Sequence, residues 1–398
     1  MIKEIKKSKL RMLVLSHTSS LGGAELSLLE HLKALSSKMD IYVILPKNGP
    51  IITFLKKFVK EIYVVPFFWW CAKGLKLIPY SISNALNLVS LLLVARIIIK
   101  VKPDVCWTNT MTPPPILGMI CKLLNIPHIW FIREFGKEDH GLSFIIGEKL
   151  GYNIIARLSK AIFVNSKAVG RKFLRFTYWR KVPIYVIDNI VETPLHIPTI
   201  KRACGKKQNN EHIRIAHVGV IKQGKGQEDL IHALSILRDK IKFICYIVGA
   251  IEDKEYYRRI KHIIAENGLE KSIIFTGYLP REGVFYLMKN SDIIVICSRS
   301  EAFGRVVVES MKLGKAVIAT RRGGIVEIIQ DGENGLLYEP NDIEELAQKI
   351  MLLACDSQLR KMLGEKAKQY AFKRFNEERI SKYLLKIIKR IASENINA

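Results

Sequence analysis

Two carboxylates eight residues apart, Glu301 and Glu309, mark the densest cluster of chemically reactive residues in the sequence. The segment Ser298–Glu309 follows an apolar strand-like run, so we expect Glu301 in a strand-end loop and Glu309 in the next helix. A carboxylate accepts hydrogen bonds well from the paired hydroxyls of a sugar or a ribose. Phe303 and Gly304 at the helix entry offer backbone amides to an oxyanion. Glu309 could instead be an ordinary surface residue, but its apolar neighbours predict an enclosed position.

A basic, glycine-containing loop precedes another predicted helix. Lys222 and Lys225 flank Gly224 in this loop, and Lys225-Gly226 leads directly into the helix. An ammonium group at a helix start can meet a diphosphate, and Lys222 could reach the same anion. The alternative is a solvated basic loop.

Gly22 and Gly23 form a second glycine-rich helix entry, after the first strand-like run. Glycines let a backbone approach a ligand closely, and the free amides of a helix start favour phosphate. The segment is neither a Walker A loop nor a Gly-x-Gly-x-x-Gly fingerprint. Taken alone, it is equally consistent with a simple turn.

Short runs rich in Val and Ile alternate with helical patterns along the whole chain, which predicts an α/β protein with parallel sheets. Ligands of such sheets bind beyond the carboxyl ends of the strands. We therefore expect two Rossmann-like, doubly wound domains facing a cleft. The predicted strands are 11–16, 41–45, 62–65, 104–107, 128–132, 161–164, 184–187, 213–218, 243–248, 273–275, 293–296, 316–319 and 336–338.

A break in this alternation sets the domain boundaries. Residues 191–212 contain prolines, a glycine and several lysines, which favours a linker. We thus predict an N-terminal Rossmann-like domain over 1–190 and a C-terminal Rossmann-like domain over 213–375. A last helix over 376–398, with one apolar face, is expected to pack back on the first domain.

The amino-acid composition narrows the classes of protein to which the chain could belong. The 398 residues are 49% hydrophobic, so extended disorder is excluded, and 63 Lys+Arg against 37 Asp+Glu give a net charge of +26. That charge must meet an anion: nucleic acid, an anionic bilayer or phosphate-bearing small molecules. The seven cysteines contain no Cys-x-x-Cys pair, which argues against zinc and for buried thiols in a reducing compartment. No signal peptide or membrane span is expected, so we predict a cytoplasmic protein.

The segment from about 213 to 342 resembles the nucleotide-binding domain of retaining GT-B glycosyltransferases. This large group (glycosyltransferase family 4-like) includes glycogen synthases, mannosyltransferases and many bacterial polysaccharide enzymes. The first half of the chain is similar more loosely. The resemblance rests on Glu301 and Glu309 in Ser-Glu-Ala-Phe-Gly, Lys225-Gly226, Phe275–Tyr278, Gly323-Gly324 with Glu327, Gly22–Glu25, Lys102–Val105 and Ala161–Ser166.

The resemblance implies that the domain over 1–190 binds the acceptor and the domain over 213–375 binds the nucleotide sugar. It also implies a role for each matching residue. Glu309 would hold the ribose hydroxyls of a nucleotide sugar. Glu301 would contact the donor sugar, assisted by the backbone amides of Phe303 and Gly304. Lys225 would stabilise the diphosphate as the leaving group, so Glu301 and Lys225 are the implied catalytic residues.

Gly22 and Gly23 would close on the phosphates from the other domain, and Tyr278 would lie near the base. One residue of the loop departs from the family, which usually has Arg after the first glycine, where this chain has Val220. Lys222 is then the candidate for the missing positive charge.

A second departure concerns the first domain, where the family often has a histidine after the strand that matches 128–132. Here the strand ends in Arg133 and Glu134, which become candidates for acceptor or donor contacts. His17 and His140 could stand in for the histidine. As an alternative, each is an ordinary surface or capping residue.

The implied reaction moves a sugar from a UDP- or GDP-linked donor to an acceptor hydroxyl with retention. The donor is a substrate and not a cofactor, and without an Asp-x-Asp motif no metal is expected. Two alternatives share the fold: a sugar-nucleotide epimerase and a non-catalytic nucleotide-sugar-binding relative. A nucleic-acid-binding protein would suit the charge, but no helix-turn-helix, zinc-finger or RNA-binding signature supports it.

The acceptor is argued from the surface chemistry of the first half. Aromatic residues 67–70 lie near Lys73 and Lys76, and the apolar stretch 85–99 follows. Aromatics beside lysines suit a membrane interface. We therefore predict a peripheral enzyme on the inner face of the membrane, extending a polyprenyl-linked glycan in cell-surface polysaccharide synthesis. The alternative is that these aromatics pack in the core of the first domain.

Overall fold

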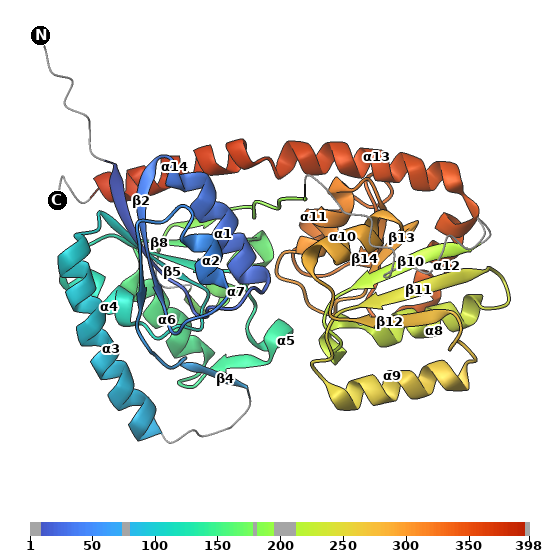
Figure 1. Cartoon of the computed structure of the whole chain (residues 1–398), viewed down its shortest axis with the longest axis horizontal. Coiled ribbons are helices and arrows are strands. Elements are labelled where there is room, and N and C mark those ends of the chain that lie inside the picture. Colours follow the sequence, from blue (N-terminus) through green and yellow to red (C-terminus); the bar gives the residue numbers. More distant parts are fainter. Residues whose placement is uncertain (1–8, 74–79, 178–180, 195–211, 395–398) are drawn as a thin grey trace, which may run out of the picture. The chain divides into compact units, whose positions relative to one another are not determined.

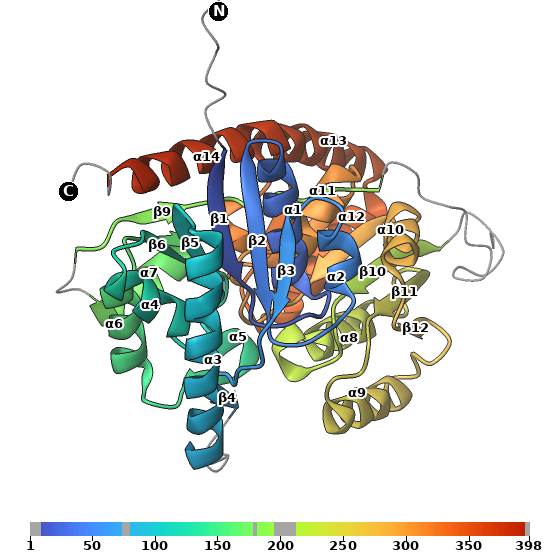
Figure 2. The ribbon, with the colours of Figure 1, turned by 60° about the vertical axis from the view of Figure 1, so that its left-hand side comes forward.

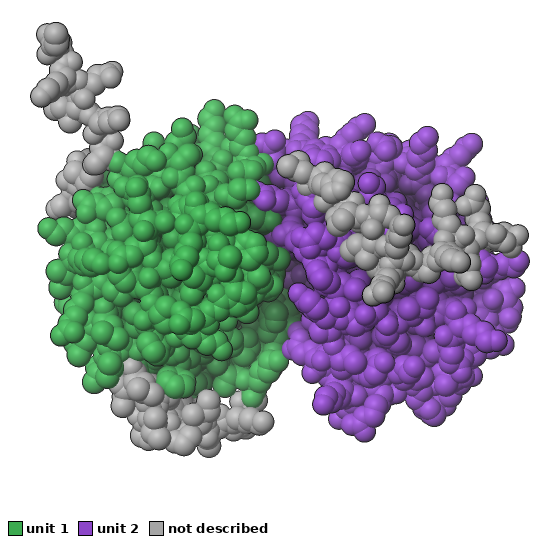
Figure 3. Space-filling model, in the orientation of Figure 1, with its two compact units in different colours: residues 1–190, 377–398 green, residues 191–376 purple. Residues whose placement is uncertain are grey.

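A computed structural model describes residues 9–73, 80–177, 181–194 and 212–394, with only the backbone for 80–86. Its chain forms two compact units (Figure 3). Unit 1 comprises Met1–Ile190 together with Glu377–Ala398, and unit 2 comprises Val191–Asn376. Most of the predicted linker, residues 195–211, lies outside the described residues, as does Lys76.

Seven parallel strands form the main sheet of unit 1, in the order β3-β2-β1-β5-β6-β8-β9. The order reverses between β1 and β5, which makes this pair the switch point of the sheet. A separate antiparallel pair, β4 and β7, was not predicted, because each strand has only three residues. The strands are β1 Leu10–Leu15, β2 Met39–Leu45, β3 Glu61–Val64, β4 Cys71–Lys73, β5 Val105–Asn109, β6 His128–Ile132, β7 Leu142–Phe144, β8 Ala161–Val164 and β9 Ile184–Val186.

Helices cover both faces of this sheet because its strands are apolar on both sides. One cluster of buried residues joins the sheet to α1 and to α14. The opposite cluster joins it to α3 and α4 (Figures 1 and 2). The helices are α1 Gly23–Ser36, α2 Ile51–Leu55, α3 Tyr80–Val101, α4 Ile116–Leu123, α5 Lys137–His140, α6 Glu148–Leu158, α7 Lys167–Thr177 and α14 Glu377–Ser393.

Unit 2 repeats the design with six parallel strands in the order β12-β11-β10-β13-β14-β15, so its switch point lies between β10 and β13. The strands are β10 Ile213–Val218, β11 Phe243–Val248, β12 Ile273–Gly277, β13 Ile293–Ile296, β14 Ala316–Thr320 and β15 Leu336–Tyr338. The helices are η1 Gln223–Lys225, α8 Gln227–Leu237, α9 Lys254–Glu266, α10 Arg281–Lys289, α11 Arg305–Lys312, η2 Ile325–Glu327, α12 Ile343–Cys355 and α13 Ser357–Arg374.

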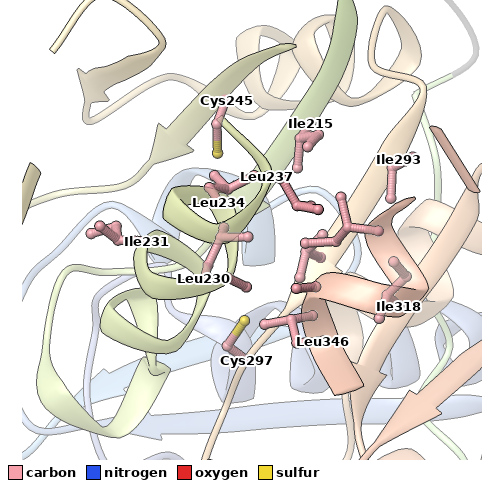
Figure 4. Packing of buried hydrophobic residues seen from close by; sticks show 14 of the residues in the cluster. Ile215, Leu230, Ile231, Leu234, Leu237, Cys245, Ile293, Cys297, Ile318 and Leu346 are labelled. Carbon is pink, nitrogen blue, oxygen red and sulfur yellow. The ribbon is translucent and has the colours of Figure 1, made fainter. Parts of the chain in front are cut away.

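In unit 2, neighbouring residues of one strand belong to the hydrophobic cores on opposite faces of the sheet. On β10, Ile215 packs with α8, α9 and α12, as Figure 4 shows for part of that cluster. The next residue, Ala216, belongs to the cluster that includes α10, α11 and α13. Successive side chains of a strand point to opposite faces, so both faces must be apolar.

The predicted two-domain α/β architecture is confirmed: each predicted strand run coincides with a strand, with ends shifted by no more than two residues. Cys106, Cys245 and Cys297 are buried, as their apolar contexts predict. The apolar face of the last helix is buried in unit 1. Within the described part of the chain, none of the helices combines the length and the apolar character needed to cross a bilayer.

Candidate functional site

The switch point of unit 2 brings together two of the predicted residues that are 76 positions apart in the sequence. The loop after β10 carries Lys225, and the loop after β13 carries Ser298 and Glu301. Lys225 Nζ lies 2.8 Å from Glu301 Oε2 and 3.4 Å from Ser298 Oγ. Both charged side chains are about a quarter exposed, so the pair is open to a ligand. This ion pair is the centre of the candidate site.

Close packing between the two loops fixes the position of Lys225. Gly226 has a φ of 65°, and a Cβ there would overlap the carbonyl oxygen of Cys297, so only glycine suits this position. The Gln227 side-chain amide donates to the Val220 carbonyl at 2.9 Å. The Arg299 backbone N–H donates to the Gly224 carbonyl at 3.0 Å. The loops are thus held together through their backbones, which leaves the Lys225 side chain to the site.

Glu309 is enclosed, as predicted, with 7% of its surface exposed. It lies on α11, where Arg305 Nε donates to Glu309 Oε1 at 3.1 Å. Arg281, at the start of α10, places a guanidinium nitrogen 3.7 Å from the same oxygen. Sequence analysis missed Arg281. The available signal was the general rule that a buried carboxylate requires a cationic or hydrogen-bonding partner.

Phe303 and Gly304 lie at the entry to α11, but the Phe303 ring is part of the core. It is buried against Phe375, with ring centroids 5.7 Å apart, so only its backbone can serve a ligand. Gly304 caps the helix with a φ of 104°. The Gly324 backbone N–H donates to the Glu301 carbonyl at 2.8 Å, and a Cβ at Gly324 would overlap the Ala302 carbonyl oxygen. The predicted glycine loop after β14 therefore supports the backbone of Glu301.

Lys222 and Tyr278 are not part of the Lys225–Glu301 ion pair: Lys222 pairs elsewhere and Tyr278 is exposed. Lys222 Nζ lies 3.5 Å from Glu252 Oε2, in the loop after β11. Tyr278 follows β12, at the edge of the sheet, and is 77% exposed. Its segment is connected to the site through Arg281, three residues later, which reaches Glu309.

Gly22 and Gly23 open α1 in unit 1, but the start of this helix already has an anionic partner. Glu25 receives a hydrogen bond from the Gly22 backbone and pairs with His17 Nε2 at 2.9 Å. Burial alone would raise the pKa of Glu25, but His17 and the backbone amides of Gly22 and Glu25 lower it below its usual value. A phosphate at this helix start would therefore have to displace the Glu25 carboxylate. His140, the other histidine considered, lies at the end of α5 with an exposed side chain.

Arg133 and Glu134 follow β6 and are both buried. The Arg133 guanidinium donates to Asn109 Oδ1 at 2.6 Å and to Asn189 Oδ1 at 2.8 Å, and it stacks 3.7 Å from the centre of the Phe131 ring. Glu134 accepts backbone hydrogen bonds from Met111 at 2.5 Å and from Arg133 at 3.0 Å. Both side chains are thus engaged within unit 1.

Glu134 also supports a strained segment that sequence analysis missed. Thr110 follows β5 with a φ of 68°, a conformation that β-branched residues rarely adopt. The Trp130 indole N–H donates to the Thr110 carbonyl at 2.6 Å, and the Trp70 indole N–H donates to the Met111 carbonyl at 2.7 Å. Such strain persists only where the surroundings dictate it and is common at functional sites.

Known glycosyltransferases are similar to this chain in sequence. Residues 201–370 match the family model described as "Glycosyl transferases group 1". "Uncharacterized glycosyltransferase MJ1069" of Methanocaldococcus jannaschii is 27% identical over 98% of this chain and 100% of its own length. "Uncharacterized glycosyltransferase MJ1178" of the same organism is 40% identical over 146 residues, 37% of this chain and 41% of its own length. The match thus spans less than half the length of MJ1178.

The fold is similar to that of a solved structure. HepE of Anabaena, in complex with UDP, is similar with a TM-score of 0.76 and 21% identity, over 96% of this chain and 100% of that chain. Another structure of the same protein is in complex with UDP-glucose. At this level of identity the similarity establishes the fold, which together with the two parallel-sheet units is the predicted GT-B fold.

Glu134 provides a test of the electrostatics of unit 1. Burial raises its pKa to about 7, although the Met111 amide and His17 oppose that rise. Between pH 4.5 and 7 the native state therefore keeps a proton that the unfolded state releases, so the stability contributed by this group falls as pH rises. The variant Glu134→Gln should lack this fall. Relative to the variant, wild type should lose about 3 kcal/mol of unfolding free energy between pH 4 and pH 8.

Urea unfolding of both proteins across this pH range measures the difference. Glu25→Gln serves as the control of opposite sign. The lowered pKa of Glu25 means that its contribution is lost only as pH falls below 4.5. Parallel stability curves for wild type and Glu134→Gln would contradict the assignment.

Proposed function

We propose that this chain, a GT-B glycosyltransferase of the family 4-like type, transfers a sugar from a nucleoside diphosphate to an acceptor hydroxyl. The observation that carries the proposal is the contact between Lys225 and Glu301 at the switch point of unit 2, close to the α11 entry that leads to Glu309. A parallel sheet binds its ligand at this point. The site thus has a cation for a diphosphate and carboxylates for sugar and ribose hydroxyls.

Lys225 is the group that we assign to the leaving diphosphate. Its ammonium stands just before α8, where the helix start adds partial positive charge. Negative charge develops on the diphosphate as the sugar departs, and a fixed positive charge stabilises it most at that stage. Lys222, 3.5 Å from Glu252, is a second cation of the same loop that could also contact the diphosphate.

Glu301 and Glu309 are assigned to hydroxyl groups of the donor. Glu309 lies between two guanidinium groups, which hold its carboxylate in place to accept hydrogen bonds from paired hydroxyls. Glu301 is more open and would exchange its bond to Lys225 for a bond to the sugar. The structure of HepE with UDP-glucose supports a UDP-linked donor as the first candidate, with GDP-linked donors as the second.

The ribose role of Glu309 predicts a loss of donor affinity. In Glu309→Ala, binding of the preferred nucleoside diphosphate should weaken at least about 100-fold, because charge-assisted hydrogen bonds to two hydroxyls are lost. Calorimetry or thermal shift with UDP, GDP and their sugar conjugates measures this change. The control is Glu344→Ala, at an exposed acidic residue of α12. Unchanged affinity in Glu309→Ala would remove the ribose role.

We also propose that transfer proceeds with retention and without a metal ion. Lys225 and the helix start supply positive charge at the position where other enzymes use a cation. Proton NMR should show the donor's anomeric configuration in the product, and EDTA should leave the initial rate unchanged. An inverted anomeric centre would exclude retention, and recovery of an EDTA-inhibited rate by Mg²⁺ or Mn²⁺ would exclude metal independence.

A membrane-bound, lipid-linked acceptor is the last part of the proposal, and the surface of unit 1 supports it. Helix α4 packs against both α3 and α6. Each of these helices exposes a leucine: Leu88 of α3 is 65% exposed, Leu123 of α4 is 84% exposed and Leu150 of α6 is 54% exposed. Lys122, next to Leu123 on α4, donates to the Arg157 backbone carbonyl of α6 at 3.2 Å, so one basic side chain lies between these two helices. Exposed leucines with adjacent cations suit the interface of an anionic bilayer.

The aromatic residues 67–70 fit both alternatives made from the sequence, because some pack in the core of unit 1 and others are exposed. Phe67 is buried in the core of unit 1, and the Trp70 ring stacks on Trp130 at 6.0 Å. Phe68 and Trp69 remain exposed, and the Trp69 indole N–H donates to the His17 carbonyl at 2.8 Å. Only these two side chains could reach a membrane, so the leucines of α3, α4 and α6 are the main candidates.

A vesicle assay tests the membrane surface. The triple variant Leu88→Glu, Leu123→Glu and Leu150→Glu should bind vesicles of anionic phospholipid at least about tenfold more weakly than wild type, because apolar burial is replaced by charge repulsion. Wild-type binding should also weaken as salt is raised. Leu352→Glu, at an exposed leucine of unit 2, is the control. If wild type fails to bind such vesicles at low salt, the membrane proposal is wrong.

A further inference from the structure

A buried histidine lies beside the candidate site and has no role in the function proposed so far. His217 is the second-last residue of β10, and 1% of its surface is exposed. Its Nδ1 lies 3.0 Å from the Val295 carbonyl oxygen on β13, across the switch point. A carbonyl oxygen only accepts, so Nδ1 carries the proton and Nε2 presents a lone pair.

The lone pair of His217 has no hydrogen-bond partner among the described residues. It faces the space above Gly219, which the aliphatic part of Lys225 also occupies. A Cβ on Gly219 would lie 3.8 Å from His217 Nε2 and 3.5 Å from Lys225 Cδ. A buried acceptor without a donor destabilises a fold by roughly 1–3 kcal/mol, so its position next to a lysine calls for a reason.

The imidazole is neutral at physiological pH. Burial lowers the pKa of His217 to about 4, and the nearby charge of Lys225 adds to this effect. His217 therefore acts as a neutral acceptor and does not repel the lysine. The charged group that acts on the His217 ring is Lys225. Glu301 is linked to the ring only through its ion pair with Lys225.

We infer that His217 is a positioning residue for Lys225, whose ammonium it receives when the donor sugar occupies Glu301. This inference rests on the proposed function. In the structure Lys225 donates to Glu301 at 2.8 Å, so hydroxyl groups that bind Glu301 compete with the ammonium for the carboxylate. His217 Nε2 then accepts a hydrogen bond from the displaced ammonium and keeps it at the switch point.

A neutral acceptor suits this task better than a second carboxylate. A carboxylate beside Lys225 would cancel the positive charge that the leaving diphosphate needs. An imidazole lone pair fixes the direction of the ammonium and leaves its charge intact. The benefit should appear in the transfer step, when charge develops on the diphosphate, more than in ground-state binding.

Two substitutions separate the two nitrogen atoms of the ring. His217→Asn keeps an amide N–H near the Nδ1 position, for Val295, and removes the Nε2 acceptor. His217→Gln places an amide oxygen near the Nε2 position and gives up the bond to Val295. If Nε2 positions Lys225, the Asn variant should lose about tenfold in kcat with little change in KM or in unfolding midpoint. The Gln variant should recover part of that loss. His262→Asn, at an exposed histidine of α9, is the control.

Release of nucleoside diphosphate from UDP-glucose or another stabilising sugar nucleotide gives the rates. In addition, ¹⁵N NMR of labelled histidine should show the Nε2 resonance of His217 shifting when that sugar nucleotide saturates the protein. Wild-type kcat in the Asn variant, or an unshifted resonance, overturns the inference. If wild type binds no nucleotide at all, the proposed function and this inference fail together. Binding with unchanged turnover in the Asn variant overturns only the role of His217.

Discussion

The candidate site of unit 2 depends on one contact at the switch point of its sheet, the ion pair between Lys225 and Glu301. Lys225 is held 2.8 Å from Glu301, yet both side chains remain partly exposed, so the pair can open. A fully buried pair would resist this exchange, because breaking it leaves an uncompensated charge in a low-dielectric interior. Under the proposed function, the ion pair is a resting contact in which the donor would replace both partners, with its diphosphate at Lys225 and its sugar at Glu301.

Glycines make this contact possible because two loops from different strands must approach at backbone distance. Gly226 accommodates the Cys297 carbonyl, and Gly324 accommodates the Ala302 carbonyl while its N–H supports Glu301. Each glycine gives up a side chain that would otherwise separate the loops. The site is thus positioned by main-chain contacts, which leaves the polar side chains available for ligands.

The sequence allowed prediction of whatever depends on local pattern. Apolar runs identified every strand of the two main sheets, and the apolar neighbours of Glu309 predicted its burial. Arg281 and His217 could not be found in this way, because their importance comes from partners 28 and 78 residues away. In the sequence His217 is one polar residue in an apolar strand, and only the register of β10 beside β13 shows which ring nitrogen remains unpaired. Thr110 was missed for a similar reason, since three residues distant in sequence impose its strained backbone.

The two units use their polar strand-end residues in different ways. In unit 1, Arg133 is engaged by two asparagines, Glu134 by two backbone amides and Glu25 by His17 and a helix start. These bonds hold the loops in place and already engage the polar side chains within unit 1. In unit 2, Lys225 contacts a carboxylate that can exchange partners, and the nearby Nε2 atom of His217 has no hydrogen-bond partner among the described residues. A charged ligand gains most binding free energy where it replaces a contact that costs little to break. Under the proposed function, the anionic half of the donor is therefore expected on unit 2.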